Sequence, residues 1–132
     1  MTRIKEKFTA LESQNQKALI AYIMVGFPNE KATISTVRGL VKGGVDIIEL
    51  GFPFSDPLAD GPVIQNASTI SLQKGANIAK FFSLVKKIRK ETDVPIVLMT
   101  YTNILYNKGY AKFIAEATKA GIDGFILPDM SI

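Results

Sequence analysis

The sequence predicts an α/β fold in which parallel strands alternate with helices, as in the first half of a (β/α)8 barrel. Short apolar runs recur along the chain and are separated by segments with helical periodicity. Loops rich in Gly, Pro and Asp follow these runs, as expected where an α/β protein carries its functional residues. Residues 42–50 also match residues 119–127 position by position, each a helix end, a glycine and a strand, which favours a fold of repeated βα units.

Each element follows from its own pattern, in the order of the chain. Ile4, Phe8 and Leu11 recur at i, i+4 and i+7, so residues 2–14 are predicted to form an amphipathic helix. Strands are predicted at 18–25, 45–50, 94–100 and 122–127. Helices are predicted between Asn29 and Gly43, and at 62–74, 77–90 and 109–120, with residues 101–108 as a loop. In 62–74 the predicted inward side chains are Val63, Ile64, Ala67 and Ile70; in 109–120 they are Phe113, Ile114 and Ala117.

Length and composition indicate one globular domain with a real core. The chain has 132 residues, of which 47% are apolar and 21% are charged. A full (β/α)8 barrel takes roughly 250 residues, so residues 1–132 supply about half of a single barrel domain, about four βα units after an N-terminal helix. We expect a fragment of a longer protein; the alternative is an open half-barrel whose two sheet edges a partner covers. The absence of cysteine and histidine excludes disulfides, thiolate catalysis, most zinc sites and histidine triads. Acid–base chemistry is left to Asp, Glu, Lys or Tyr, and no metal site is expected.

The charge pattern points away from nucleic acids and membranes. The net charge of +4 is spread out, and its densest group, Lys86, Lys87, Arg89 and Lys90, is typical of the solvated face of a helix. Residues 1–8 lack the apolar core of a signal peptide. The longest apolar run, residues 18–25, is too short to cross a membrane. We therefore expect a soluble, cytoplasmic protein.

Glu49 is the first candidate for chemistry, because it ends an apolar strand. Side chains alternate along a strand, so Glu49 shares a face with Val45 and Ile47. A carboxyl among apolar neighbours has a raised pKa unless it is paired. An ion pair with a lysine is an equally good interpretation of Glu49 alone, but the C-terminal edge of a parallel sheet favours function.

Further candidates follow the ends of the other predicted strands. Asp60, before Gly61 and Pro62, is by itself the typical N-cap of a helix, and Asp56 is by itself a turn residue. Their common position favours a functional interpretation over these structural ones. All the residues that follow strand ends are expected to meet at one edge of the sheet: 26–27, Glu49, 56–60, 101–103 and Asp129. Tyr22 and Met99 lie near the same ends and alone would be ordinary core residues. Together these residues predict an apolar pocket with two acids, suited to an uncharged ring system and not to a metal.

Residues 49–67, with the string PFSDPLADGP, closely resemble the tryptophan synthase alpha subunit family. The resemblance runs along essentially the whole chain and includes residues 25–28, 99–103 and 106–109. It implies a TIM barrel lyase that cleaves indole-3-glycerol phosphate to indole and glyceraldehyde 3-phosphate without a metal or an organic cofactor. It also implies that the fragment, residues 1–132, is the N-terminal half of a single barrel domain.

The resemblance also implies roles for individual residues. Glu49 would be the general acid–base, and Asp60 would accept a hydrogen bond from the indole N–H. Tyr22, Met99 and Pro128 match positions that line the indole pocket. Pro53, Asp56 and Asn103 match the surface that meets the beta subunit of an alpha2-beta2 assembly, which receives the indole.

Alternative functions follow from the length of the chain. The phosphate-binding loops of the family lie in the second half of the barrel, so a 132-residue chain alone is expected to be poorly active. One alternative is a non-catalytic half-barrel that binds or activates a beta-type partner. A second is another phosphate-binding barrel, such as an isomerase or epimerase, which the lack of His and Cys disfavours. A third is a folding fragment that pairs with its missing half or with a second copy.

Overall fold

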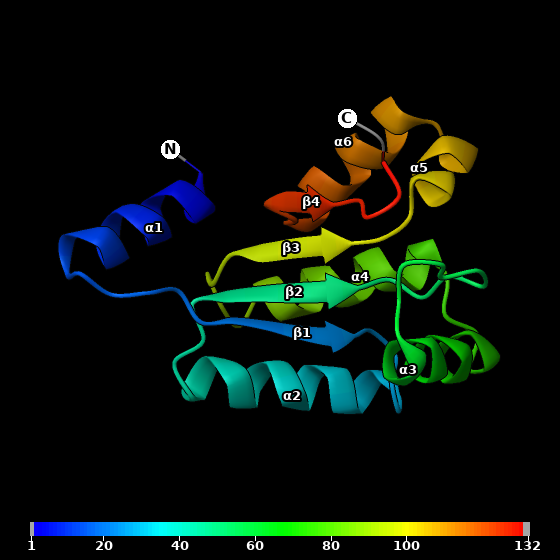
Figure 1. Cartoon of the computed structure of the whole chain (residues 1–132), viewed down its shortest axis with the longest axis horizontal. Coiled ribbons are helices and arrows are strands. Elements are labelled where there is room, and N and C mark those ends of the chain that lie inside the picture. Colours follow the sequence, from blue (N-terminus) through cyan, green and yellow to red (C-terminus); the bar gives the residue numbers. More distant parts are fainter. Residues whose placement is uncertain (1, 131–132) are drawn as a thin grey trace.

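Four parallel strands form one sheet in the order β1-β2-β3-β4 in the structure, a computed structural model that describes residues 2–130 (Figure 1). The strands are β1 (Ile20–Met24), β2 (Ile47–Gly51), β3 (Ile96–Met99) and β4 (Gly124–Ile126). β1, β3 and β4 lie inside their predicted apolar runs, whereas β2 begins two residues after the start of the run 45–50 and extends one residue past its end, to Gly51. Sequence-adjacent strands are neighbours in the sheet throughout, as in a barrel of βα units.

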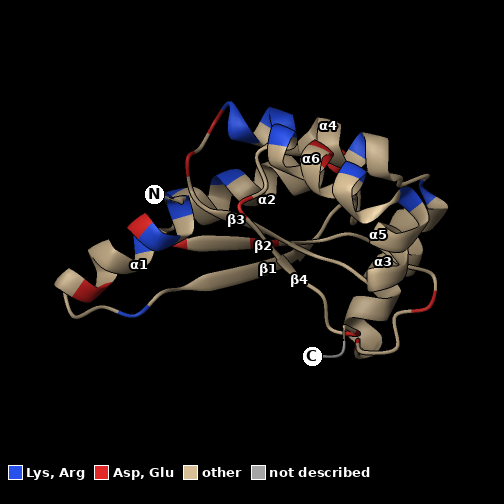
Figure 2. Cartoon of the chain, turned by 90° about the horizontal axis from the view of Figure 1, so that it is seen from above, with Lys and Arg blue, Asp and Glu red and all other residues tan. Residues whose placement is uncertain are grey.

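The helices lie on one side of the sheet and at its two ends. They are α1 (Arg3–Ser13), α2 (Glu30–Lys42), α3 (Pro62–Gln73), α4 (Ile78–Arg89), α5 (Thr102–Lys108) and α6 (Tyr110–Ala120). Helices α2, α4 and α6 cover one face of the sheet, and the other face is bare (Figure 2). Helix α1 lies near the starts of the strands, whereas α3 and α5 lie beyond their carboxyl ends (Figure 1). None of the helices in residues 2–130 is both long and apolar enough to cross a membrane.

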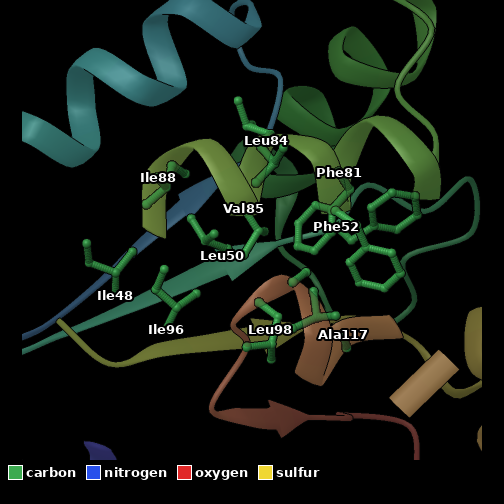
Figure 3. Packing of buried hydrophobic residues seen from close by; sticks show 14 of the residues in the cluster. Ile48, Leu50, Phe52, Phe81, Leu84, Val85, Ile88, Ile96, Leu98 and Ala117 are labelled. Atoms are coloured by element: carbon green, nitrogen blue, oxygen red, sulfur yellow. The ribbon is translucent and has the colours of Figure 1, made fainter. Parts of the chain in front are cut away.

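The core fills the space between the sheet and its covering helices (Figure 3). Ile48 and Leu50 of β2 and Leu98 of β3 have no exposed surface. They face the apolar side of α4, whose buried residues are Phe81, Phe82, Leu84, Val85 and Ile88. The helical spacing in 77–90 predicts an inward face of Ile78, Phe81, Phe82, Val85 and Ile88. This face is confirmed except at Ile78, which is half-buried, and Leu84 is buried as well.

Helix α5 corrects the prediction of a loop at residues 101–108. Its N-cap residue, Tyr101, makes no side-chain capping bond. The cap comes instead from Asp129, whose carboxylate accepts hydrogen bonds from Thr102 N at 2.9 and 3.1 Å and from Thr102 Oγ1 at 3.0 Å. A helix start that is capped from 27 residues away leaves no local signal in the sequence.

Two predicted inward side chains point outward. Val63 of α3 is 78% exposed and Ile114 of α6 is 44% exposed. Helix α3 instead buries Ala67, Ser68 and Ser71. Ser68 Oγ accepts from Phe54 N at 3.0 Å and donates to Phe54 O at 2.9 Å, and Ser71 Oγ donates to Val25 O at 2.6 Å. These hydrogen bonds to loop backbone turn the polar side of α3 inward, which apolar periodicity does not reveal.

The internal repeat has a structural counterpart at the starts of the strands. Asp46 accepts a hydrogen bond from Leu19 N at 2.8 Å, and its equivalent Asp123 accepts one from Ile96 N, also at 2.8 Å. Each carboxylate therefore binds the chain at the start of the preceding strand. Helix α1 contacts both, because Arg3 lies 3.0 Å from Asp123 and Lys7 lies 3.4 Å from Asp46.

Candidate active site

The bare face of the sheet carries the candidate site. The strand register aligns Tyr22, Glu49, Val97 and Gly124 in one row, and Met24, Gly51, Met99 and Ile126 in the next row toward the carboxyl ends. Alternation places these residues opposite the helix-covered face that holds Ile48 and Leu50. Glu49 is thus the acid in a mainly apolar row near the ends of the strands.

Glu49 is half-buried on this face. Burial raises the pKa of its carboxyl above the usual range, since water that would solvate the charge is displaced. Among the ion pairs of residues 2–130 none involves Glu49, so the alternative of a structural pair with lysine has no support there.

Asp60 is not the N-cap of α3, although its position before Gly61 and Pro62 suggests that role. The N-cap of α3 is Gly61, and no side chain caps this helix. Asp60 is half-buried, and its backbone oxygen accepts a hydrogen bond from Gln65 Nε2 at 2.8 Å. Its carboxylate is therefore not engaged in capping the helix that follows.

Tyr101 holds the loop that carries Asp60. Ala59 N donates to the Tyr101 hydroxyl at 3.1 Å, and the rings of Tyr101 and Phe54 stack with centroids 5.0 Å apart. Burial raises the pKa of Tyr101, and the charge of Asp60 raises it further. The sequence placed Tyr101 at the rim without a role; its position directly after a strand was the available signal.

The charges of Glu49 and Asp60 both act on the hydroxyl of Tyr22. Its ring lies against Gly51, where a Cβ atom would fall 2.0 Å from the Tyr22 hydroxyl oxygen. Burial raises the pKa of Tyr22, and the charges of Asp60 and then Glu49 raise it further. Both carboxylates therefore act on the same hydroxyl, as expected if they share a site.

The other predicted site residues occupy different environments. Met99 is half-buried on the bare face, and Pro128 is exposed after β4. Asp56 and Asn103 are exposed, and Asn103 Oδ1 accepts a hydrogen bond from Asn107 Nδ2 at 2.7 Å. Pro53 is fully buried beneath the loop. The rim thus combines half-buried acids and apolar side chains with an exposed polar border.

Two cavities adjoin the rim, and neither is lined by Glu49 or Asp60. The larger, of about 640 Å³, is lined by Tyr22, Met24, Phe27, Pro62, Ile64, Ala67 and neighbouring residues of β1, α2 and α3. The smaller, of about 220 Å³, lies on the outer side and includes Pro53 in its wall. Tyr22, whose pKa both acids raise, does line the larger cavity, and the apolar pocket with two acids stays a prediction. No group of three acidic side chains in residues 2–130 is placed to hold a metal ion.

Comparison with known proteins extends the resemblance to the whole fold. A sequence model of the tryptophan synthase alpha chain family matches residues 8–132. The tryptophan synthase alpha chain of Aquifex aeolicus is 44% identical over 131 residues, which cover 98% of this chain and 50% of that protein. That of Methanosarcina acetivorans is 48% identical over 130 residues, covering 98% and 47%. The chain thus spans about half the length of the curated relatives it matches.

Solved structures agree with the sequence matches. The tryptophan synthase alpha subunit of Legionella pneumophila superposes with a TM-score of 0.95 at 40% identity, covering 98% of this chain and 50% of that chain. A chain of the tryptophan synthase complex of Pyrococcus furiosus superposes with a TM-score of 0.82 at 39% identity, covering 86% and 47%. The predicted fold class, half of a TIM barrel, is confirmed. The chain belongs to the tryptophan synthase alpha chain family.

Proposed function

We propose that residues 1–132 form the N-terminal half of a single (β/α)8 barrel domain whose reaction is the cleavage of indole-3-glycerol phosphate to indole and glyceraldehyde 3-phosphate. The observation that carries the proposal is that Glu49 and Asp60 act electrostatically on one buried hydroxyl beside a bare, mainly apolar face. Membership of the family supports the same reaction.

Glu49 is the proposed general acid–base. Cleavage of the carbon–carbon bond needs a proton on the indole ring carbon that bears the glycerol chain. It also needs removal of the proton from the hydroxyl whose carbon becomes the aldehyde. A carboxyl whose pKa is raised by burial carries a proton closer to neutral pH, where it can be donated to carbon.

Asp60 is the proposed stabiliser of charge on the ring. Protonation of the ring carbon leaves positive charge on the indole nitrogen, and an ionised carboxylate that accepts the N–H hydrogen bond stabilises it. The two acids then have different tasks, and their different surroundings suit this division: Glu49 lies in an apolar row of the sheet, whereas Asp60 lies on a loop.

Other residues complete the proposal. Tyr22, Met99 and Pro128 are proposed to contact the indole ring, with Tyr22 presenting an aromatic face. Exposed Asp56 and Asn103 are proposed to contact a beta subunit in an alpha2-beta2 assembly, while buried Pro53 would shape the loop beneath that contact. The solved relative from P. furiosus is described as a tryptophan synthase complex, which supports such a partner. A cytoplasmic location is part of the same proposal.

The test compares Glu49→Gln and Asp60→Asn in the complete gene product that carries this sequence. Release of indole from indole-3-glycerol phosphate is measured with and without a beta subunit. General acid–base catalysis contributes ~10²–10⁴-fold, so Glu49→Gln should lower kcat by at least about 100-fold. Exposed Glu12, changed to Gln, is the matched control and should leave kcat unchanged. Activation of the beta subunit that survives Glu49→Gln, without indole release by the unsubstituted protein, would favour the non-catalytic module.

A further inference from the structure

The Tyr22 hydroxyl is a buried polar group with no hydrogen-bond partner in the described part of the chain. Thr100 Oγ1 shares this property but follows the helix-covered side of β3, away from the site. Tyr22 lies on the bare face, in register with Glu49. An unpaired hydroxyl of this kind is uncommon and calls for an explanation, because buried polar groups in proteins are nearly always paired.

The position of the Tyr22 ring is fixed by the backbone beneath it. At position 51 a Cβ atom would come within 2.0 Å of the Tyr22 hydroxyl oxygen and within 2.6 Å of Cζ, so the end of the ring rests directly on the glycine. The hydroxyl is therefore aimed at the carboxyl end of β2, where the loop that carries Asp60 begins. A bulkier residue at 51 would move the hydroxyl away from this place.

The charged groups around this hydroxyl come from several elements. Asp60 of the loop after β2 acts on it most strongly, followed by Glu49 of β2. The pKa of Tyr101, after β3, is raised by burial first, then by the charge of the same Asp60 and a side-chain hydrogen bond with it, and by the charge of Asp129, after β4. Asp60 is thus flanked by two phenols, and Tyr101 already binds its loop through Ala59 N.

We propose that Tyr22 is a positioning residue for Asp60: when a ligand occupies the bare face, the Tyr22 hydroxyl donates a hydrogen bond to the Asp60 carboxylate. This inference rests on the proposed function. It requires only a change in the Asp60 side chain or a small shift of residues 57–60, which lie outside helices and strands. The bond would hold the carboxylate toward the ring nitrogen of the ligand.

Asp60 is a better acceptor than Glu49 for this hydroxyl. A donor stabilises the ionised form of a carboxyl group. That suits Asp60, which is proposed to remain ionised. It would oppose the raised pKa of Glu49, on which proton donation to carbon depends. Hydrogen bonds between phenols and carboxylates are charge-assisted and short, so the pair would also restrict the orientation of Asp60.

The test is Tyr22→Phe in the complete gene product, with exposed Tyr106→Phe as the matched control. Because the hydroxyl has no hydrogen-bond partner within residues 2–130, its removal should leave the melting temperature unchanged or higher. It should lower kcat about tenfold or more, since a hydrogen bond to a charged group is lost. Tyr106→Phe should change neither of these.

A double-mutant cycle supplies a readout other than turnover. Affinity for indole-3-propanol phosphate, which keeps the ring and the phosphate but lacks the reacting hydroxyl, is measured for Tyr22→Phe, Asp60→Ala and the double variant. Alanine is used because the amide oxygen of asparagine would still accept the hydrogen bond. Coupling through one hydrogen bond predicts that Tyr22→Phe weakens binding in the parent but not in the Asp60→Ala background.

Other outcomes overturn the proposal in distinguishable ways. A lower melting temperature with additive affinities in the double-mutant cycle would make Tyr22 a structural residue. Unchanged kcat and additive affinities would leave the lyase reaction intact and remove Tyr22 from it. If the unsubstituted protein neither releases indole nor binds the analogue, the proposed function and this inference fail together.

Discussion

Glu49 combines a position suited to acid–base chemistry with an unfavourable environment for its own charge. It is half-buried, it has no ion-pair partner within residues 2–130, and its pKa is raised by burial. A group with a raised folded-state pKa favours folding only where it is protonated in both states. Above that pKa the buried carboxylate lowers the free energy of unfolding, which is a recurrent cost of functional sites.

Because the stability of the protein depends on the ionisation of Glu49, the effect of Glu49→Gln on the melting temperature should depend on pH. Above the ordinary Glu pKa, burial opposes ionisation of this carboxyl in the folded protein, whereas the amide of the variant does not titrate. The variant should therefore melt at a higher temperature than the parent, increasingly so as the pH rises. Below about pH 4, near the ordinary Glu pKa, both side chains are neutral and the two melting temperatures should converge. Scanning calorimetry across pH 4–8 checks this. An equal stabilisation at both ends of the range would show that charge burial is not the cause.

Gly51 gives a second test at a single position. Alanine there would place a methyl group against the Tyr22 ring, so the ring or the strand must move. Overpacking of this kind should lower the free energy of unfolding by about 1–3 kcal/mol. Gly39, inside α2 and with open space around it, is the matched control, where alanine should add about 0.5–1 kcal/mol. Urea unfolding of both variants checks the sign of each change; equal effects would mean that contact with Tyr22 does not matter.

Single residues were predictable where the signal was local. Strand alternation predicted the face on which Glu49 lies, and the position of Asn29 directly before a helical segment predicted that it caps α2. The neighbours of Tyr22 were not predictable, because contact with Gly51 and proximity to Asp60 depend on how adjacent strands and a loop pack. The roles assigned to Glu49 and Asp60 came from the family resemblance and remain proposals.

At the level of elements, the two copies of the internal repeat differ in how deeply they bury their aspartate. The side chains of Asp123 and Arg89 are only 7% and 10% exposed and form an ion pair. Arg89 also donates to the backbone oxygens of Gly121, at 2.9 Å, and Val94, at 2.6 Å. Asp46 instead pairs with partly exposed Lys7. The end of α4 is therefore bound to the starts of β3 and β4 by a buried charge network.

The difference predicts unequal costs for the same substitution. Asp123→Ala leaves the Arg89 guanidinium without its buried partner and should lower the free energy of unfolding by about 3–5 kcal/mol. Asp46→Ala removes mainly one hydrogen bond, from Leu19 N, and should cost about 0.5–1.5 kcal/mol. Chemical denaturation of the two variants checks the ranking. Equal losses of unfolding free energy in the two variants would show that the hydrogen bonds and ion pair of Arg89 add nothing to the stability of the second copy of the repeat.

Helices and strands were predicted correctly where the apolar periodicity was strong. The prediction failed where residues distant in the sequence determine how a helix begins or which face it buries. Helix α4 was found with its apolar face because Phe81, Val85 and Ile88 recur at helical spacing. Helix α5 was missed because its cap is Asp129, and the inward face of α3 was misplaced because Ser68 and Ser71 bind loop backbone.

For the molecule as a whole, the sheet has two edge strands and one bare face. β1 and β4 each pair on one side only, and Ile20 of β1 is 51% exposed although its apolar run suggested full burial. The alternation of strands and helices was enough to predict a parallel half-barrel, but the exposure of each strand depends on its neighbours in space. Edge strands of this kind are templates for pairing with another chain.

The free edges predict self-association of residues 1–132 expressed alone. Sedimentation should show species larger than 14.4 kDa at micromolar concentration, because two edge strands and an apolar face are available for pairing. A lysine on an edge strand opposes such pairing, so Ile20→Lys should shift the distribution toward the monomer. Monomeric behaviour of the parent at all concentrations would contradict this prediction.

Helix α1 reaches across the starts of β2 and β4 through Lys7 and Arg3, with β3 between them. Four helical residues span about 6 Å, whereas two strand spacings span roughly 10 Å. The long side chains of Lys7 and Arg3 bridge this difference, so α1 joins the starts of two strands that are not neighbours. The spacing of these strand starts, and with it the separation of the two acids at the opposite end, then depends on a helix that contacts neither of them.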